Sequence, residues 1–557
     1  MAALNISIGG ESFRRLREEN RCYVDKTGFI EELISSTQAM VSLITRPRRF
    51  GKTLNMTMLQ EFFDIRRESR ALFEGLGVSR NAELCEKWMN RYPTLFMTFK
   101  GVEGQNFKDS LIHFRETAVN LCGEHAYLLE SEKVSRENKA MLQRVLDRQA
   151  EPAELAAVLQ TLCRALEAHW GQPAILLIDE YDVPINYAEQ NGYYKEMIGF
   201  MRALLGSALK TNFSLKFAVL TGCLRIARES IFTGLNNFKC YGISDVQFAD
   251  KFGFTVAEID DLLSQAGFSD KKALLKKWYD GYRFGDRSEI YCPWDVLLYL
   301  DDLQHNASAQ PQAYWNNTSG NAIVRTLINR AGDDIKDKIE RLIAGEAIEE
   351  ELAESLTYDI VYESESNIWT MLYLTGYLTK AAEQPEGANT ALVIPNKEVR
   401  QIFISTVSKW FNESLQKQDL SRFVQALWDG NAEAVQNTLT DFLYDTISYF
   451  DSAENYYHGF MSGLLRGAGL NVKSNREHGL GRSDLLIEDG RRRRALIIEL
   501  KIAPEYEELE AKAEEGLKQI EERRYEAGLG PQIRKVVSYG IAFWKKESFV
   551  KVKESAR

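Results

Sequence analysis

The pattern of hydrophobic and polar residues divides the chain into three parts. In the first part, short and almost wholly apolar runs alternate with longer segments in which apolar residues recur every three or four positions. The short runs resemble buried strands, and the longer segments have the periodicity of amphipathic helices. The short runs are residues 40–46, 93–100, 174–178 and 215–222. Strands alternating with helices predict a doubly wound α/β domain with a parallel sheet, which we place at residues 1–245.

The middle of the chain, residues 246–450, is mainly helical by the same periodicity. Within it, residues 367–400 differ: a helix is followed by a turn-rich stretch, a short strand (ALVIP) and the start of another helix. This order suggests a winged-helix-like module. A plain helical bundle with one hairpin fits it about equally well.

The last part, residues 451–557, changes pattern again. A helix at 453–468 is followed by three strand-like segments, a helix at 505–527 and a strand at 533–544. The three segments are 470–476, 481–488 and 494–502, and the Asp489-Gly490 pair between the last two is typical of a hairpin turn. The order α-β-β-β-α-β predicts a self-contained small α/β domain.

Composition constrains the location and the partners. The 557 residues are 45% hydrophobic and 27% charged, which is ordinary for a globular protein with large cores. The net charge of −11 argues against a protein that coats polyanions in general, although it is compatible with a local basic groove. Seven scattered cysteines without a CxxC pair favour a reducing compartment and no structural zinc. Since no segment has the roughly 20 apolar residues of a membrane span, we expect a cytoplasmic protein without a membrane partner.

A candidate phosphate-binding loop follows the first predicted strand. Residues 46–53 fit the pattern GxxxxGK[ST], except that Arg46 stands at the first glycine position. Gly51 would let backbone N–H groups approach phosphate, Lys52 would reach the β- and γ-phosphates, and Thr53 would offer its hydroxyl to Mg²⁺. Because the loop leaves a strand and opens a helix, we predict ATP as the ligand. The predicted nucleotide-binding residues of the loop are Arg46, Pro47, Arg48, Arg49, Phe50, Gly51, Lys52 and Thr53.

Two adjacent acids follow the apolar run 174–178. Asp179 at the strand tip is placed to hold Mg²⁺ with Thr53, and Glu180 is placed to polarise the attacking water as the catalytic base. The alternative is a simple polar strand end. Thr221, at the end of the next strand, and Arg225 just beyond it are candidates for contact with the γ-phosphate; the alternative there is a solvated turn.

The sequence leaves the roles of two arginines of the phosphate loop open. Arg48 and Arg49 could bind phosphate, face nucleic acid, or reach a partner subunit in a homo-oligomer. The sequence does not decide between Arg225 acting on the γ-phosphate in cis and Arg48 or Arg49 acting in trans.

The C-terminal part holds a second candidate site. Glu499 and Lys501 are two residues apart on one predicted strand and therefore point to the same face, and a hairpin would bring Asp484 beside them. Asp484 and Glu499 would hold Mg²⁺ or Mn²⁺ for phosphodiester cleavage, and Lys501 would position water and phosphate. Gln519 on the following helix is a further catalytic candidate. Nearby basic residues, including 491–494, could hold a nucleic-acid backbone or merely be solvated.

Both parts resemble known domains. The first resembles the AAA-ATPase-like domain of bacterial and archaeal proteins, whose loop also carries arginine at its first position. The matching strings are YVDKT (23–27), LITRPRRFGKT (43–53), LLIDEYD (176–182), LTGCLR (220–225), IFTGLNNF (231–238) and WYDGYRFG (278–285). The last part resembles the PD-(D/E)xK nuclease domain, which has a restriction-endonuclease-like fold and is usually fused to that ATPase. Its matching strings are YHGFMSGLL (457–465), SNREHGLGRSDLLI (474–487) and ALIIELKIA (495–503).

Three functions compete. The first is a nuclease that is regulated by ATP binding and hydrolysis and acts on DNA rather than RNA; analogy with other ATPase–nuclease fusions adds a role in defence against foreign DNA. The second is a nucleotide-dependent signalling switch whose C-terminal domain binds nucleic acid without cutting, although the intact set Asp484, Glu499 and Lys501 argues against it. The third, a DNA translocase, is disfavoured by the acidic net charge and by the lack of helicase motifs.

Overall fold

The structure, a computed structural model, describes residues 4–35, 40–210, 212–224, 238–317, 324–325, 333–353, 356, 358–361, 363–415, 420–445, 453–478 and 481–557. The chain divides into two units. Unit 1 comprises Met1–Trp315 and Glu349–Val399, and unit 2 comprises Asn316–Ile348 and Arg400–Arg557. The three-part division at 1–245, 246–450 and 451–557 stays a prediction.

The parallel sheet predicted for the first part is confirmed. Within the described residues of unit 1, five strands form it in the order β2-β3-β4-β1-β5, and every neighbouring pair is parallel. The strands are β1 (Val41–Thr45), β2 (Thr94–Thr98), β3 (Ala174–Asp179), β4 (Leu215–Gly222) and β5 (Phe238–Tyr241). The short edge strand β5 was not predicted, because its sequence FKCY is not an apolar run. Since β4 lies between β1 and β3, the carboxyl ends of these three strands meet at one edge.

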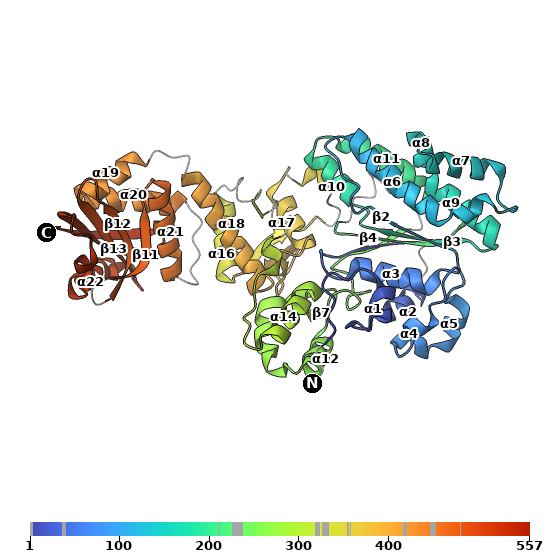
Figure 1. Cartoon of the computed structure of the whole chain (residues 1–557), viewed down its shortest axis with the longest axis horizontal. Helices are drawn as coiled ribbons and strands as arrows, with labels where there is room; N and C mark the ends of the chain where they lie inside the picture. Colours follow the sequence, from blue (N-terminus) through green and yellow to red (C-terminus); the bar gives the residue numbers. More distant parts are fainter. Residues whose placement is uncertain are drawn as a thin grey trace. The chain divides into compact units, whose positions relative to one another are not determined.

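Helices cover both faces of this sheet (Figure 1). One layer contains α1 (Phe13–Glu18), α2 (Gly28–Ser35), α3 (Lys52–Phe63), α4 (Arg70–Phe73) and α5 (Ala82–Trp88). The opposite layer contains α6 (Phe107–Glu124), α7 (Arg136–Leu146), α8 (Pro152–Leu155), α9 (Val158–Trp170), α10 (Val183–Gln190) and α11 (Tyr194–Leu209). The strands β1, β3 and β4 are buried along almost their whole length, which explains their apolar composition.

The rest of unit 1 is mainly helical, as predicted. It contains α12 (Val256–Ala266), α13 (Lys272–Tyr279), the hairpin of β6 (Tyr282–Phe284) and β7 (Arg287–Ile290), and α14 (Pro293–His305). The segment 367–400 shows the predicted order of helix, strand pair and helix. Its elements are α17 (Glu365–Leu374), β9 (Thr379–Lys380), β10 (Asn389–Val393) and the start of α18 (Lys397–Leu415), and β8 (Ile348–Glu351) adds a strand in the order β8-β10-β9.

Unit 2 contains a mixed sheet. In its described part, five strands have the order β11-β12-β13-β14-β15; β13 and β14 are parallel, and the other neighbours are antiparallel. The strands are β11 (Val472–His478), β12 (Gly481–Asp489), β13 (Arg494–Ile502), β14 (Lys535–Trp544) and β15 (Glu547–Ala556). The helices are α16 (Asp333–Ala344), α19 (Ser421–Asp429), α20 (Ala432–Asp445), α21 (Ala453–Gly467) and α22 (Leu509–Glu522). The restriction-endonuclease-like α/β domain is confirmed, with β15 as an unpredicted edge strand.

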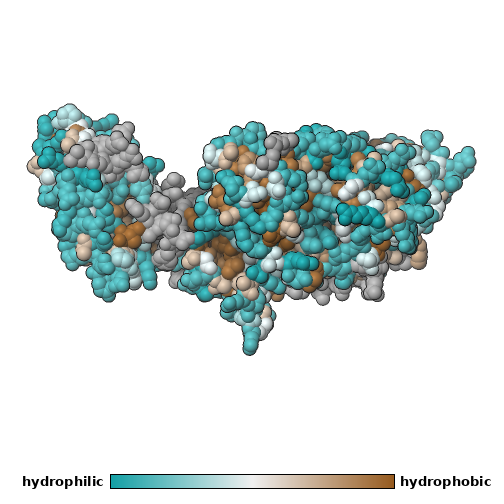
Figure 2. Space-filling model, turned by 90° about the horizontal axis from the view of Figure 1, so that it is seen from below, coloured by the Kyte–Doolittle hydropathy of each residue, from teal (hydrophilic) through white to brown (hydrophobic). Residues whose placement is uncertain are grey.

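Hydrophilic residues cover most of the face shown in Figure 2. In the part of the chain that the structure describes, no helix is both long and apolar enough to cross a membrane.

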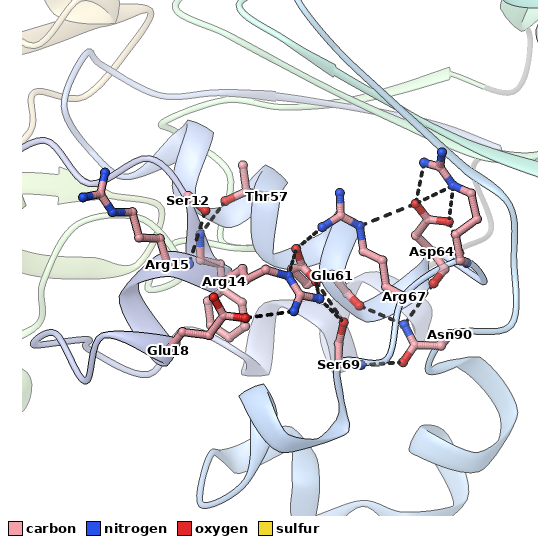
Figure 3. A network of polar contacts seen from close by, with 12 residues as sticks. Ser12, Arg14, Arg15, Glu18, Thr57, Glu61, Asp64, Arg67, Ser69 and Asn90 are labelled. Atoms are coloured by element: carbon pink, nitrogen blue, oxygen red, sulfur yellow. Dashed lines mark hydrogen bonds and ion pairs between the residues drawn. The ribbon is translucent and has the colours of Figure 1, made fainter. Parts of the chain in front are cut away.

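A network of ion pairs anchors the far end of α3, the helix that begins at the phosphate loop (Figure 3). The Glu61 carboxylate is nearly inaccessible to solvent; it pairs with Arg14 at 2.7 Å and with Arg67, and it accepts a hydrogen bond from Ser69 at 2.9 Å. Because Arg14 lies on α1, the network joins the N-terminal segment to α3. Carboxylates are unfavourable at a helix C-terminus, and the arginines offset that cost.

We predict that Glu61→Ala lowers the free energy of unfolding of unit 1 by about 2 kcal/mol, because two arginines and a serine lose their shared acceptor. Urea unfolding monitored by tryptophan fluorescence measures this change. Glu18→Ala is the matched control: it removes an exposed partner of the same Arg14 and should change stability by less than about 0.5 kcal/mol. Equal effects of the two variants would contradict the anchoring role of Glu61.

Candidate functional site

The phosphate loop connects β1 to α3 with the geometry that anion binding requires. Gly51 caps α3 with φ of 83°, a left-handed conformation that glycine adopts without strain. The Lys52 ammonium donates to the carbonyl oxygens of Arg46 at 3.0 Å and Pro47 at 2.9 Å. The loop therefore curves around the lysine, and the N-terminus of α3 begins inside this curve.

Asp179 is the centre of the first site. The Thr53 hydroxyl donates to Asp179 Oδ2 at 2.7 Å, and the Thr221 hydroxyl donates to Asp179 Oδ1 at 2.5 Å. Burial raises the pKa of the Asp179 carboxyl, while the hydrogen bonds from Thr221 and Thr53 act in the opposite direction. The three residues come from β3, α3 and β4, so the sequence-predicted set converges. Their hard oxygen atoms suit Mg²⁺, which Thr53 and Asp179 would hold.

Glu180 has an unusual backbone. Its φ of 54° lies in the left-handed region, which is uncommon for a residue with a side chain and is often found at functional positions. Burial, followed by the charge of Asp179, raises the pKa of Glu180. Glu180 lines the same cavity as Lys52 and Thr53, which suits the predicted role of a base for water.

A cavity of about 340 Å³ extends from this site. Lys52, Thr53 and Glu180 line one part of it, and Tyr23, Phe254 and Trp294 belong to its remaining wall. The cavity thus combines a polar phosphate-binding part with an aromatic wall, which is the composition expected of a nucleotide pocket.

The Arg46 side chain has a structural environment. It is completely buried, and its guanidinium donates hydrogen bonds at 2.8–3.1 Å to the carbonyl oxygens of Thr45, Tyr241, Gly242 and Phe248. Its guanidinium also lies over the rings of Phe252 and Phe284, 5.4 Å from each centroid. Burial lowers the pKa of Arg46 to about 10. This geometry explains why arginine can replace the first glycine of the loop: its side chain anchors the loop to the segment after β5.

The other described residues of the loop have different surroundings. Phe50 is buried against Tyr282, with 4.9 Å between ring centroids. Arg48 and Arg49 both line the cavity; Arg48 is exposed, and the Arg49 guanidinium lies 4.8 Å from the centroid of Trp294. Arg225, predicted to contact the γ-phosphate, lies outside the described residues.

Asp182 is a residue of this region to which sequence reasoning assigned no role. It accepts hydrogen bonds from the backbone N–H groups of Cys223 at 2.9 Å and Leu224 at 3.1 Å. It therefore fixes the start of the turn after β4, directly beyond Thr221. The repeated acids of LLIDEYD were the available signal, but spacing alone could not show which of them face the turn.

The second site lies on one face of the sheet in unit 2. The pairing of Leu485 with Ile498 places Asp484 opposite Glu499, and Asp484 Oδ2 accepts a hydrogen bond from Leu500 N at 2.8 Å. Lys501 Nζ lies 3.8 Å from Glu499 Oε1. The structure thus brings the three sequence-predicted residues together, on the face that α22 covers.

Gln519 of α22 connects the members of this site. Its side-chain oxygen accepts a hydrogen bond from Lys501 at 2.6 Å, and its amide nitrogen donates to Glu499. The same nitrogen donates to the Tyr525 hydroxyl at 3.3 Å. Tyr525, which is buried, was not singled out from the sequence, because it follows α22 in a short 3₁₀ turn and has no motif of its own.

Close packing of α22 on the sheet makes these contacts possible. A Cβ atom on Gly540 of β14 would lie 2.1 Å from the Ala513 carbonyl oxygen, so only glycine permits this approach. Gly516, on the facing side of α22, lies against Gly540 and the Lys501 side chain. The two glycines set the distance at which Gln519 reaches Glu499 and Lys501.

The acid pair has the character of a metal site. Glu499 Oε2 is buried without a hydrogen-bond partner. Burial, followed by the charge of Asp484, raises the pKa of Glu499 to about 8. A divalent cation would relieve both costs, because it would bind the orphaned oxygen and favour the ionised carboxylates. Asp484 and Glu499 would be its carboxylate ligands; in the described residues, no cluster of three or more His, Cys, Asp or Glu side chains is arranged for a metal.

The folds and sites define a P-loop ATPase-type domain and a restriction-endonuclease-like domain in one chain. Residues 7–232 match the family model described as predicted AAA-ATPase, and residues 452–553 match that of the PD-(D/E)XK nuclease superfamily. The chain therefore combines these two domains, as the resemblance implied. It is also 26% identical over 410 residues to an uncharacterized protein in the vnfD 5′ region of Azotobacter chroococcum mcd 1, covering 72% of this chain and 69% of that protein.

Glu499 predicts a pH dependence of stability. With a pKa of about 8 in the folded state and about 4.5 when unfolded, Glu499 keeps its proton to higher pH in the folded protein. Between these values the folded state binds more protons, so its stability falls as pH rises. The stability of Glu499→Gln relative to wild type should therefore increase from pH 5 to pH 8, by at most about 1.4 kcal/mol per pH unit.

Urea unfolding in EDTA at pH 5, 6.5 and 8 measures this difference. Glu522→Gln, an exposed substitution at the end of α22, should show a pH-independent difference from wild type. Mg²⁺ or Mn²⁺ should stabilise the wild type most at the high-pH end, where the carboxylate is free to bind. A parallel pH dependence of wild type and Glu499→Gln would contradict the proton assignment.

Proposed function

We propose that this protein is an ATP-regulated nuclease, in which ATP binding and hydrolysis in unit 1 control metal-dependent phosphodiester cleavage in unit 2. One observation supports the proposal: in each unit, candidate reactive side chains from separate elements lie close together. Thr53, Asp179 and Thr221 converge beside Lys52 in the first unit. Asp484, Glu499 and Lys501 converge under Gln519 in the second.

In the ATPase site, the roles follow from the contacts. Lys52 would exchange its carbonyl partners for the β- and γ-phosphate oxygens. Thr53 and Asp179 would hold Mg²⁺, which neutralises charge on the phosphates when it is bound. Glu180 would accept a proton from the attacking water, and the Thr221 hydroxyl would orient Asp179.

In the nuclease site, Asp484 and Glu499 would hold Mg²⁺ or Mn²⁺. The cation would supply an activated water and stabilise the leaving oxygen. Lys501 lies beside the acids and would orient the attacked phosphate, while Gln519 fixes the orientation of both Lys501 and Glu499. The Tyr525 hydroxyl would help to hold Gln519 in place by accepting a hydrogen bond from its amide nitrogen.

Nucleic acid is the proposed substrate, with DNA preferred to RNA. Arg491, Arg492 and Arg493 at the β12–β13 hairpin are exposed and could pair with backbone phosphates. Defence against foreign DNA, a cytoplasmic location and homo-oligomer formation are parts of the proposal that rest on the sequence arguments alone.

The decisive experiment measures cleavage of plasmid DNA, linear DNA and RNA by the purified full chain. Reactions contain Mg²⁺ or Mn²⁺, with and without ATP, and ATP hydrolysis is recorded in parallel. We expect Asp484→Ala to abolish cleavage and to leave ATP hydrolysis intact. We expect Lys52→Ala to abolish ATP hydrolysis and the effect of ATP on cleavage.

Two exposed substitutions are matched controls: Asp441→Ala in unit 2 and Lys108→Ala in unit 1 should behave as wild type. Cleavage by Lys52→Ala that equals wild type with and without ATP would refute the regulation. ATP hydrolysis without cleavage of any substrate would favour the nucleotide-dependent switch.

A further inference from the structure

The phosphate loop contains an arginine, Arg49, that lines the same cavity as Lys52 and packs on aromatic rings. Arg49 has φ of 70°, a left-handed conformation that costs free energy for a residue with a side chain. Its guanidinium lies over two indole rings, 4.8 Å from the centroid of Trp294 and 5.9 Å from that of Trp315. Such cation–π contacts can hold the loop in this conformation.

Trp315 is itself fixed by polar and aromatic contacts. Its backbone N–H donates to Glu398 Oε1 at 2.8 Å, and its ring lies 5.8 Å from that of Tyr377. Glu398 and the neighbouring Asp295 are both almost wholly buried. Burial raises the pKa of both carboxyls, and the positive charge of Arg49 favours ionised Asp295. We call Arg49, Trp294, Trp315 and Glu398 the Arg49 clasp.

The clasp contains residues next to two exits of the chain from unit 1. The chain passes into unit 2 directly after Trp315 and again directly after Val399, which follows Glu398. The hydrogen bond from Trp315 N to Glu398 therefore ties both exits to each other, and the Trp315 ring ties them to the phosphate loop. These contacts connect the phosphate loop to the two points at which the chain leaves unit 1.

We propose that Arg49 is a positioning residue of the phosphate loop, and that the Arg49 clasp transmits the nucleotide state of the loop to the segments that enter unit 2. The proposal rests on the proposed function and specifies its route. It assigns Arg49 a task inside its own subunit, in place of action on a neighbouring one.

The physical basis is the rigidity of the short loop. Gly51 and Arg49 both have positive φ and are separated by one residue, so phosphate bound at Lys52 constrains the backbone of Arg49. A change in that backbone moves the guanidinium relative to the two indoles. Because Trp315 is buried and hydrogen-bonded, it cannot move with the guanidinium independently of Glu398.

The test uses the full chain labelled with 5-fluorotryptophan. The nine tryptophans give separate fluorine signals, and Trp294→Phe and Trp315→Phe assign the two in the clasp. We expect ATP with Mg²⁺ to shift both signals in the wild type. The shift of Trp315 should be lost in Arg49→Ala and partly kept in Arg49→Lys, which retains the cation. Trp170, bonded to Tyr127 elsewhere in unit 1, should not shift.

Calorimetric titration with ATP gives the second readout. Arg49→Ala should weaken ATP binding about tenfold and Trp315→Phe about threefold, in line with the strength of cation–π contacts. At saturating ATP, Trp315→Phe should still hydrolyse ATP, but its nuclease activity should no longer respond to ATP. Trp170→Phe is the matched control and should keep wild-type affinity and response.

The outcomes separate this inference from the proposed function. ATP binding that leaves the Trp315 signal unmoved would overturn the clasp and leave the ATPase site standing. A wild-type response of the nuclease in Trp315→Phe at saturating ATP would overturn the transmission. Failure of the wild type to bind ATP would overturn the proposed function and the inference together.

Discussion

The Asp179 carboxylate is the constraint on which the candidate nucleotide site depends. It is buried at the end of β3, and burial of a charge is tolerated only when its oxygens have partners. Here the partners are the hydroxyls of Thr53 and Thr221, which come from α3 and β4. Satisfying one carboxylate therefore fixes the distance between three elements of the sheet and its covering helix. The same oxygens are the ones that a magnesium ion would use, so the requirement of folding and the requirement of function coincide.

The candidate metal site of unit 2 also contains a buried carboxylate, but with fewer partners. Glu499 is as deeply buried as Asp179, but one of its oxygens has no partner, and its pKa is raised to about 8. Gln519 partly compensates by donating to the other oxygen, and the glycine contact between α22 and β14 brings it close enough. Asp179 is thus stabilised by its own protein, whereas Glu499 depends on what binds to it. A site of this kind costs stability in the absence of its cation, which is common at functional positions.

Sequence patterns predicted the strand positions of the candidate acids better than their surroundings. The apolar runs before Asp179 and around Glu499 located both acids at the correct strand positions, because strand burial and strand alternation are local properties. Strand β5 and the partners Tyr525 and Trp315 were missed, since they depend on contacts between distant segments. Arg46 shows the same limit: its spacing placed it in the loop, but only the fold shows that its side chain points to the carbonyls of residues 241, 242 and 248. Asp182 was visible in LLIDEYD, yet its acceptor role required the position of the turn after β4.

Two arginines restrain the phosphate loop, and one of them, Arg46, stands at a glycine position of the motif. Arg46 ties the start of the loop to the segment after β5, and Arg49 ties its centre to α14 and to the end of the segment that includes Trp315. Because Arg46 is buried and Arg49 is half-buried, a displacement of this loop changes contacts with segments far along the sequence. The departure from the glycine pattern therefore favours a loop that reports its ligand to the rest of the chain over one that only holds it.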